Sequence, residues 1–499
     1  MNRISKQKFQ LIFLAAFLLL FSSTTLAEGI SGLVTDEQGG TVPGVTVTIT
    51  NLETGVTRTL LTGETGRYDA ANLSLGTYEV SASLAGFRTA VRRGVTLTVA
   101  RDVIVDLVLV VGEIADEIVV TGEASLVDTT SATVSGLVDA RAIRDLPLNG
   151  RSFDQLITLH GGTAVFRTVG NTASQGFANK FSISGQRMGS NRFYQDGTEL
   201  SGSNRQQDLP GSAAGVNLGV EAIKEFRVLT SNFSPQYGKK TGGAILTVTK
   251  NGTNEFHGSL FEFHRNSAMD AQNFFAVGKD PFKRNNFGGS VGGPIIQDQS
   301  FFFVNYEGLR ERLSTPFFAV VPDELARQGF LPDGSGGLDD IGVDPQIAPY
   351  FNLWPLPNAE NLEDGTAFFE HAPSRKARED FFLARFDHNF SSDHSLFISY
   401  TFSDADTFAP EANPFFAATN DTRNQRATIE HKYVLSPAII NTFRFGYYRS
   451  LHAIEVDPLV TLDPAMEPFV PGERVGSIDV SGLSGTGGTQ GGTFGAKNS

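Results

Sequence analysis

The chain of 499 residues contains no cysteine and a single tryptophan, and none of its apolar runs is long enough to cross a membrane as a helix. Without cysteine, it can form no disulfide, carry no lipid on a cysteine and offer no thiolate to a metal ion. A basic patch is also absent, and the formal net charge of −14 argues against a nucleic-acid partner. If the protein enters a membrane, it must do so as a closed barrel, because only helices and barrels satisfy their backbone polar groups in lipid.

Residues 1–27 have the composition of a secretory signal. Three cations precede an apolar stretch from Phe9 to Phe21, and small residues then lead to Ala27. The stretch is shorter than the roughly 20 residues that a spanning helix requires, which disfavours the alternative of a short membrane anchor. We therefore predict export, with cleavage after Ala27.

Glycine and phenylalanine are abundant, with 53 and 41 residues, and this composition is typical of a loop-rich, mainly β protein. Residues 28–112 alternate short β-branched segments with turn residues, which predicts a small antiparallel β-sandwich. Its expected strands are 45–50, 57–62, 78–83, 95–99 and 103–111.

The rest of the chain changes character twice. Residues 125–253 mix brief helical and extended patterns and include a strong hairpin turn at Asp196–Gly197. Residues 254–499 show period-two alternation that predicts membrane-spanning antiparallel strands, with one face toward lipid and the other toward a polar lumen. A soluble sandwich with one wet face gives the same alternation. The clearest hairpins pair 382–390 with 396–402 and 427–433 with 443–447.

No group of residues has the spacing that an enzyme requires. An HExxH motif, a complete phosphate-binding loop and a nucleophile elbow are all missing from the sequence. His452 and Glu455 form an isolated H-x-x-E without a third ligand. We therefore predict that the protein is not an enzyme and has no catalytic residues, no metal site and no cofactor.

Two segments carry a family resemblance. One is EAIKEFRVLTSNFSPQYGKKTGG from Glu221, and the other is RNNFGGSVGGPIIQDQSFFFVNYEGLRER from Arg284. Together they resemble the junction between plug and barrel in the Oar-like TonB-dependent receptors, a family of outer-membrane transporters. The resemblance implies a mainly β protein with a mixed α+β plug at 125–253 and a transmembrane antiparallel barrel from 254. A family barrel has 22 strands, so we expect residues 254–499 to supply only its N-terminal part, an incomplete barrel.

The N-terminal segment carries a second resemblance. SGLVTDEQGGTVPGVTVTITNLETG, from Ser31, is similar to the carboxypeptidase regulatory-like domain. In these receptors that domain is a non-catalytic appendage. Carbohydrate binding and a role as a simple spacer are its two alternatives.

Residues 113–124 form the expected linker, and within it Glu117, Ile118, Val119, Val120 and Thr121 resemble a TonB box. A short valine-rich segment of this kind is extended by preference and suits addition to the sheet edge of another protein. The alternative is an ordinary strand, either the last of the preceding domain or the first of the plug.

The resemblance implies an outer-membrane location in a Gram-negative-type bacterium, with the N-terminal domain and the TonB box in the periplasm. The implied partners are TonB with its inner-membrane energising complex, outer-membrane lipid, and an unknown extracellular ligand such as a glycan or a peptide. The implied function is energised transport of that ligand. The alternative is a non-transporting adhesion or assembly scaffold, or a conduit for protein export.

Overall fold

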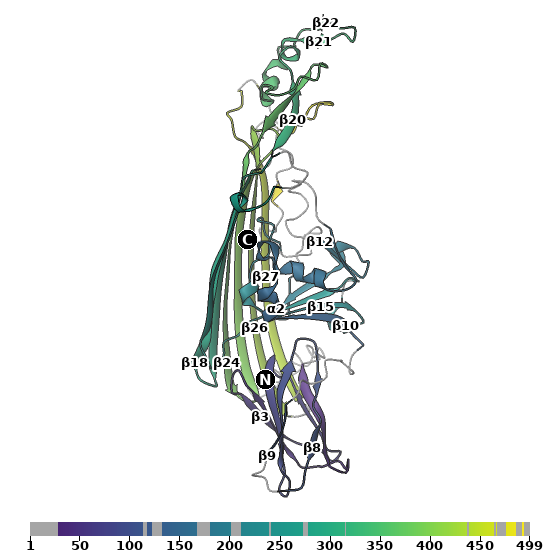
Figure 1. The fold of residues 1–499 in the computed structure, drawn as a ribbon, viewed down its shortest axis with the longest axis vertical. Helices are drawn as coiled ribbons and strands as arrows, with labels where there is room; N and C mark the ends of the chain where they lie inside the picture. The colour runs from purple at the N-terminus through teal and green to yellow at the C-terminus, as the bar shows by residue number, and fades with distance from the viewer. Residues whose placement is uncertain are drawn as a thin grey trace, which may run out of the picture. The chain divides into compact units, whose positions relative to one another are not determined.

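The computed structural model describes residues 28–112, 117–121, 132–166, 180–200, 211–238, 241–272, 278–314, 316–436, 439–463, 466, 476–485 and 492–493. The predicted signal at 1–27 lies outside the described residues, as do 113–116 and 122–124 of the predicted linker. The chain divides into two compact units. The first holds residues up to 131 except 53–56, together with 234–238, and the second holds the remainder (Figure 1). Among the described residues, no helix has the length and apolar character that a membrane crossing requires.

The first unit is a β-sandwich. Its strands are β1 (Gly29–Asp36), β2 (Thr46–Asn51), β3 (Thr57–Leu61), β4 (Arg67–Ala71), β5 (Gly76–Ser83), β6 (Thr89–Leu97), β7 (Val103–Ile104), β8 (Leu107–Leu109) and β9 (Glu117–Thr121). One sheet has the order β4-β1-β7, with β8 also on β1, and the other has the order β3-β2-β5-β6-β9. Alternate residues such as Ile30, Val47 and Val80 are fully buried between the sheets, as the period-two pattern predicts.

Two details of this unit correct the expectations from sequence. The strand expected at 95–99 is β6, which starts earlier, at Thr89, and ends at Leu97. A bulge at Gly94, whose φ is 78°, interrupts its alternation and hides its first half from a period-two pattern. The strand expected at 103–111 is divided into β7 and β8. In addition, β1 pairs in parallel with β7 and β8, and β6 pairs in parallel with β9, whereas the other pairs are antiparallel.

The predicted TonB box is one of these strands. β9 lies at the edge of the five-stranded sheet, with Val119 opposite Val91 of β6. The Val119 side chain is 40% exposed. The segment is therefore extended, as expected. Among the described residues, its pairing partner is β6 of the N-terminal sandwich.

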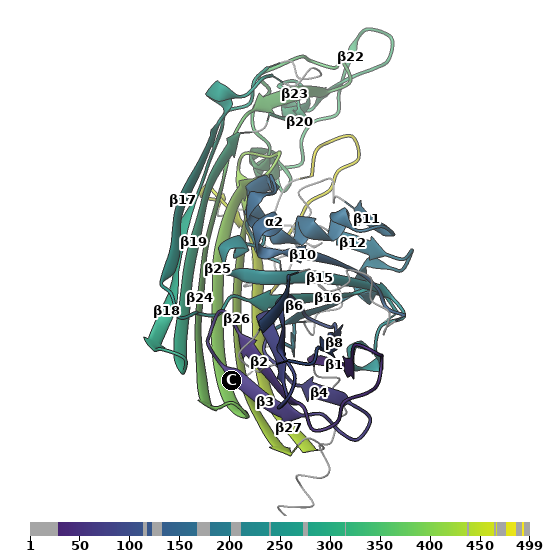
Figure 2. The same ribbon diagram turned by 60° about the horizontal axis from the view of Figure 1, so that its bottom comes forward.

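The second unit contains an eight-stranded sheet, here called the wall sheet, in which every neighbouring pair is antiparallel (Figure 2). In sheet order it comprises β17 (His257–Asn266), β18 (Phe282–Ile296), β19 (Ser300–Ser314), β24 (Ser374–Ser391), β25 (His394–Pro410), β26 (Phe416–Ser436), β27 (Ile439–Pro458) and β28 (Gly492–Thr493). The predicted turn between β24 and β25 is confirmed, with Ser391 opposite His394. The described strands form an open sheet with edges at β17 and β28.

A smaller five-stranded sheet, here called the plug sheet, has the order β10-β15-β16-β13-β14. Its strands are β10 (Val134–Asp139), β13 (Arg192–Gln195), β14 (Thr198–Glu199), β15 (Ile223–Ser231) and β16 (Ala244–Thr249). The same unit also contains α2 (Ala140–Asp145), η1 (Asn149–Arg151), η2 (Phe153–Leu159), β11 (Thr163–Phe166), β12 (Lys180–Ile183), η4 (Met188–Ser190) and η5 (Val220–Ala222), whereas η6 (Pro235–Tyr237) falls in the first unit. The hairpin expected at Asp196–Gly197 is confirmed: both residues have positive φ, 49° and 75°, and Gln195 pairs with Thr198.

A long insertion, residues 316–373, joins β19 to β24 and shares a hydrophobic core with the adjoining ends of the wall sheet. It contains β20 (Phe317–Pro322), η8 (Ala326–Gln328), β21 (Phe330–Pro332), β22 (Leu338–Asp340), η9 (Ala348–Leu353) and β23 (Thr366–His371). Trp354 is 5% exposed and packs in a cluster with Phe416 and Val456 of the wall sheet. The η7 turn (Ser267–Met269) lies in the connection between β17 and β18.

Candidate functional site

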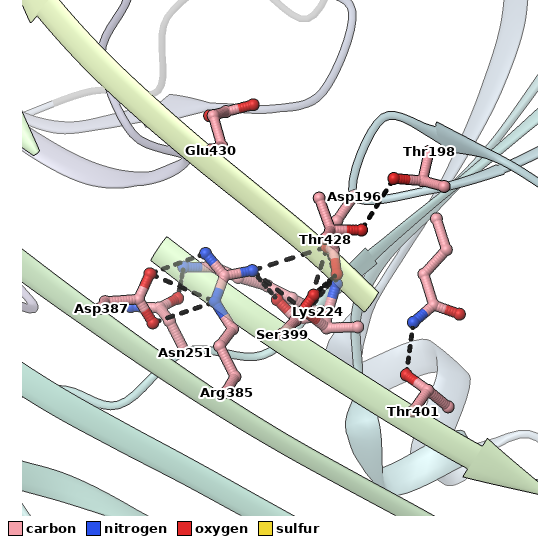
Figure 3. A network of polar contacts seen from close by, with 12 residues as sticks. Asp196, Thr198, Lys224, Asn251, Arg385, Asp387, Ser399, Thr401, Thr428 and Glu430 are labelled. Atoms are coloured by element: carbon pink, nitrogen blue, oxygen red, sulfur yellow. Dashed lines mark hydrogen bonds and ion pairs between the residues drawn. The ribbon is translucent and has the colours of Figure 1, made fainter. Parts of the chain in front are cut away.

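The candidate site is the contact between the plug sheet and the inner face of the wall sheet. Along β24, Phe382 is 37% exposed whereas the next residue, Leu383, is fully buried. The same alternation continues in the neighbouring strands, so each wall strand turns one set of side chains toward the plug and the other set away from it. The set that faces the plug is unusually polar, and several of its members are drawn in Figure 3.

Arg385 of β24 is the centre of the first anchor (Figure 3). Its Nη1 lies 3.5 Å from the Asp196 carboxylate at the plug hairpin, and it also donates to the Thr249 hydroxyl at 3.1 Å. Its Nη2 donates to Asp387 at 2.8 Å, and the guanidinium lies 4.4 Å from the Phe397 ring centroid. The charge is therefore held by two carboxylates and one aromatic face, which compensates for its burial.

Asp196 is satisfied from both sides of the contact. Its carboxylate accepts the Thr249 backbone N–H at 2.9 Å within the plug sheet, and the Ser399 hydroxyl at 3.2 Å from β25. A carboxylate that receives donors from two elements fixes their relative position, because moving either one leaves a buried acceptor without its partner.

The residues on each side of that turn form a second anchor. The Gln195 amide donates to the Thr401 hydroxyl at 2.8 Å and accepts from Arg426 at 2.9 Å. The hydroxyls of Thr198 and Thr428 lie 2.8 Å apart. These contacts tie the β13–β14 hairpin to β25 and β26.

Gly446 of β27 allows β14 to approach the wall closely. A Cβ at this position would lie 2.5 Å from the Thr198 hydroxyl oxygen and 2.6 Å from its methyl group. A larger residue at 446 would therefore displace the hairpin from the wall.

A third anchor lies along the plug segment 211–222. Glu307 of β19 accepts the backbone N–H groups of Gly219 at 3.1 Å and Glu221 at 2.8 Å. Glu379 of β24 accepts the hydroxyls of Ser212 and Ser403. Two buried wall carboxylates thus capture donors of an irregular plug segment that has no strand partner for them.

Gly219 is required by the geometry of this segment. Its φ is 112°, a region that residues with a side chain rarely adopt, and a Cβ there would lie 2.7 Å from the Phe381 ring. The surrounding contact is apolar: Val216, Leu218 and Ala222 cluster with wall residues including Phe381.

Arg151 is the centre of the fourth anchor. It pairs with Glu221 at 3.0 Å, and its guanidinium lies over Phe261 of β17 at 4.1 Å from the ring centroid. Lys250 lies 3.8 Å from the other oxygen of Glu221. Burial lowers the pKa of Lys250, and the nearby Glu221 opposes that shift.

The arrangement is suited to reversible attachment. Hydrogen bonds and ion pairs that break at this contact can be replaced by water, and the plug also has a hydrophobic core that includes Ile143, Phe226 and Val228. Among the described residues, no three His, Asp or Glu side chains are grouped to hold a metal ion.

The sequence singled out residues in only part of this site. Asp196 was identified as a turn residue, whereas Arg385, Glu307, Glu379 and Arg151 were not predicted. For the three wall residues, the available signal was a charge on the lumen-facing side of a strand, between aromatic or aliphatic neighbours. Period-two alternation predicts that such a residue faces a polar lumen, but it does not predict which plug residue it contacts. The five predicted TonB-contact residues form β9 in the other unit, and their contact with TonB stays a prediction.

Comparisons with known proteins place the two parts of the chain. A family model described as an outer membrane beta barrel domain matches residues 248–499, and one described as a carboxypeptidase regulatory-like domain matches residues 29–110. The first model covers half of the chain, so the chain belongs to the family of outer membrane β-barrel proteins. That family places it in the outer membrane of a Gram-negative-type bacterium.

A curated relative, the TonB-dependent transporter Oar of Myxococcus xanthus, is 25% identical over 307 residues, which are 58% of this chain and 27% of the relative. The chain therefore spans about a quarter of that relative. Among solved structures, the siderophore receptor PirA from Acinetobacter baumannii matches with a TM-score of 0.35 at 14% identity, over 64% of this chain and 44% of that one. The outer membrane transporter YddB from Escherichia coli matches with a TM-score of 0.40 at 12% identity, over 65% and 40%.

Proposed function

We propose that the protein takes up an extracellular ligand across the outer membrane, and that TonB and its inner-membrane complex energise this uptake through residues 117–121. The observation that carries the proposal is the set of buried polar anchors between plug and wall, centred on Arg385 and Asp196. A plug held by hydrogen bonds and ion pairs can be detached by a pull on the chain and can re-form the same contacts afterwards.

The proposed domain boundaries are a signal at 1–27, a sandwich at 28–112, a linker at 113–124, a plug at 125–253 and the start of the barrel at 254–499. In this scheme the sandwich and the linker are periplasmic. The ligand would be a glycan or a peptide and would bind where the long connections of the wall strands meet the plug.

TonB would add to β9 as a further strand. β9 is paired on one side with β6 and is an edge strand of its sheet, so among the described residues its other side has no strand partner for its backbone donors and acceptors. TonB can therefore pair with the free side of β9 or replace β6.

The absence of cysteine makes a direct test of plug movement available. Thr198→Cys combined with Thr428→Cys would place two thiols where hydroxyls now lie 2.8 Å apart, linking the plug to the wall. The matched control is Ile398→Cys with Ile429→Cys, which links two wall strands at directly paired residues on the face turned away from the plug.

In the protein as it occurs in the cell, oxidation of the plug–wall pair should stop uptake and leave surface binding intact, and reduction should restore uptake. The wall–wall control should take up ligand in both redox states. Uptake that continues with the plug linked to the wall would reject plug detachment as the transport step.

One feature favours the alternative of a surface scaffold. The insertion at 316–373 is a folded module, in which Arg327 donates to the backbone carbonyls of Phe351, Trp354 and Pro355. A rigid module suits constitutive adhesion. If deletion of residues 117–121 left the cellular function unchanged, the scaffold would replace the transporter.

A further inference from the structure

Three cations lie in one row on the outer face of the wall sheet, the face turned away from the plug. Lys283 of β18 is directly opposite Arg312 of β19, and Arg312 is directly opposite Lys376 of β24. All three are exposed. Their chain neighbours Arg284 and Glu311 pair with each other on the inner face, which confirms that the row points outward.

The row has no acidic partner. Within the part of the chain that the structure describes, none of these three side chains forms an ion pair. Like charges directly opposite each other on neighbouring strands destabilise a sheet. Three such residues in register therefore constitute a site of unbalanced positive charge.

The next outward-facing row behaves differently. Arg310 donates to both oxygens of Asp380, at 2.8 and 3.1 Å, and Arg378 donates to Asp406 at 2.6 Å and to Asp404 at 3.2 Å. The second row is thus neutralised within the protein. The first row lacks such carboxylates, so an anion from outside the protein would be required to balance its positive charge.

A hollow of about 760 Å³ opens on the same three-strand region, further along the strands. Gly289 lies directly between Leu260 and Tyr306 on the neighbouring strands, so its missing side chain leaves the floor of the hollow to the backbone. Val291 and Val304 continue the lining, which is mainly apolar. The hollow has the character of an acyl-chain site on a lipid-facing surface.

The spacing between the row and the hollow fits one lipid molecule. Phe287, at the near end of the hollow, lies four residues along β18 from Lys283, a distance of roughly 13 Å at about 3.3 Å per residue. One leaflet contributes about half of the roughly 30 Å hydrocarbon core of a bilayer. A lipid whose headgroup contacts the row therefore has acyl chains long enough to reach the hollow.

We propose that Lys283, Arg312 and Lys376 bind the phosphate of a phosphorylated membrane lipid whose acyl chain occupies the hollow at Gly289. Phosphate suits three convergent cations because it carries several charged acceptor oxygens. The site rests on the outer-membrane placement of the barrel and is independent of coupling to TonB, so the uptake experiments above do not decide it.

The test measures binding of three probes to the protein purified in detergent, by native mass spectrometry and by titration. Dimyristoyl phosphatidic acid carries phosphate and acyl chains, dimyristoylglycerol lacks the phosphate, and inorganic phosphate lacks the chains. Phosphatidic acid should bind more tightly than either of the other probes. Arg312→Gln should weaken it by about five-fold, since one surface cation contributes about that factor to an anionic lipid.

Arg449→Gln is the matched control, because Arg449 is an exposed cation of β27 outside the row and should leave affinity unchanged. Val291→Trp should fill the hollow and weaken phosphatidic acid without changing the binding of inorganic phosphate. Equal losses in the Arg312 and Arg449 variants would overturn the phosphate site. Inorganic phosphate that binds as tightly as phosphatidic acid, or a neutral Val291→Trp, would overturn the lipid assignment.

Discussion

Arg385 of the wall sheet and Asp196 of the plug hairpin form a buried ion pair, with 3.5 Å between Nη1 and Oδ1. The two residues lie far apart in the sequence and meet only in the folded protein. The pair lies where β13 turns into β14, and both residues have further partners. It is therefore one link of a network in which each residue is held by two elements.

Asp196→Asn should loosen the plug from the wall. Arg385 keeps Asp387 as a partner, so the cost should be about 1–3 kcal/mol, below the roughly 3–5 kcal/mol of a fully orphaned buried charge. Limited proteolysis of the plug segment in detergent measures the effect. Arg385→Gln combined with Asp196→Asn should cost less than the sum of the single variants, and strict additivity would contradict the coupling.

Val119→Pro should abolish cross-linking of the receptor to TonB and energised uptake, because proline removes a backbone donor and fixes φ. Val119→Ala should leave both nearly unchanged, since strand addition depends on the main chain. Export, barrel assembly and ligand binding at the surface should be intact in both variants. Wild-type cross-linking by the proline variant would restrict residues 117–121 to a strand of the sandwich.

Gly219→Ala should destabilise the plug by roughly 1–3 kcal/mol, because the new methyl group meets both a strained φ and the Phe381 ring. The unfolding midpoint of the plug is the measurement. Phe381→Ala removes the ring that the new methyl group meets. Gly219→Ala should therefore cost less when it is added to Phe381→Ala than when it is made in the native chain. If the ring truncation changes nothing, backbone strain accounts for the whole effect.

Acidification should destabilise the plug through His160. Its ring packs where a Cβ on Gly136 would lie 1.8 Å from Nδ1, and burial lowers its pKa below the ordinary 6.5. Since the unfolded chain binds the proton more readily, stability is complete above about pH 6.5 and falls as the pH drops below it. Unfolding midpoints at pH 7.5 and 5 should differ more for the native chain than for His160→Gln, and equal differences would exclude this residue.

Tyr68→Phe should destabilise the N-terminal sandwich by about 1 kcal/mol, because the buried hydroxyl donates to the Val105 carbonyl at 2.6 Å, between β7 and β8. Residues 28–112 have their own hydrophobic core and should fold alone, so thermal unfolding of that fragment is the measurement. Burial also raises the Tyr68 pKa above its usual 10, so this contribution should persist at neutral pH and disappear only in strong alkali.

Most strands and turns could be predicted from local sequence patterns. The alternation around Phe386 and Ile398 predicted β24 and β25 with the turn between them, and Asp196–Gly197 predicted the plug hairpin. The prediction was poorer where a bulge at Gly94 or the polar interruption at Asp106 broke the period. These positions depend on tertiary partners, such as the Leu33 N–H that the Asp106 carboxylate accepts at 2.8 Å.

The site was less accessible from sequence for a physical reason. Arg385 and Asp196 lie in segments that are far apart in the sequence. The local sequence around each residue does not indicate which of the many oppositely charged residues will be its partner. The parallel pairing of Val91 with Val119 is of the same kind, since an edge strand can pair with any chain that reaches it.

The order of the plug sheet has a mechanical consequence. β10 is one edge of that sheet, and the β13–β14 hairpin with Asp196 is the other. Tension applied to the chain before Val134 would load the ladder between β10 and β15 first, whereas the hairpin is clamped to the wall at the far edge. Once β10 is detached, the chain passes the load through residues 140–191 to β13, the strand beside the clamped Asp196 hairpin, so the plug could yield in two stages, with release of one edge strand first and release of the clamp second.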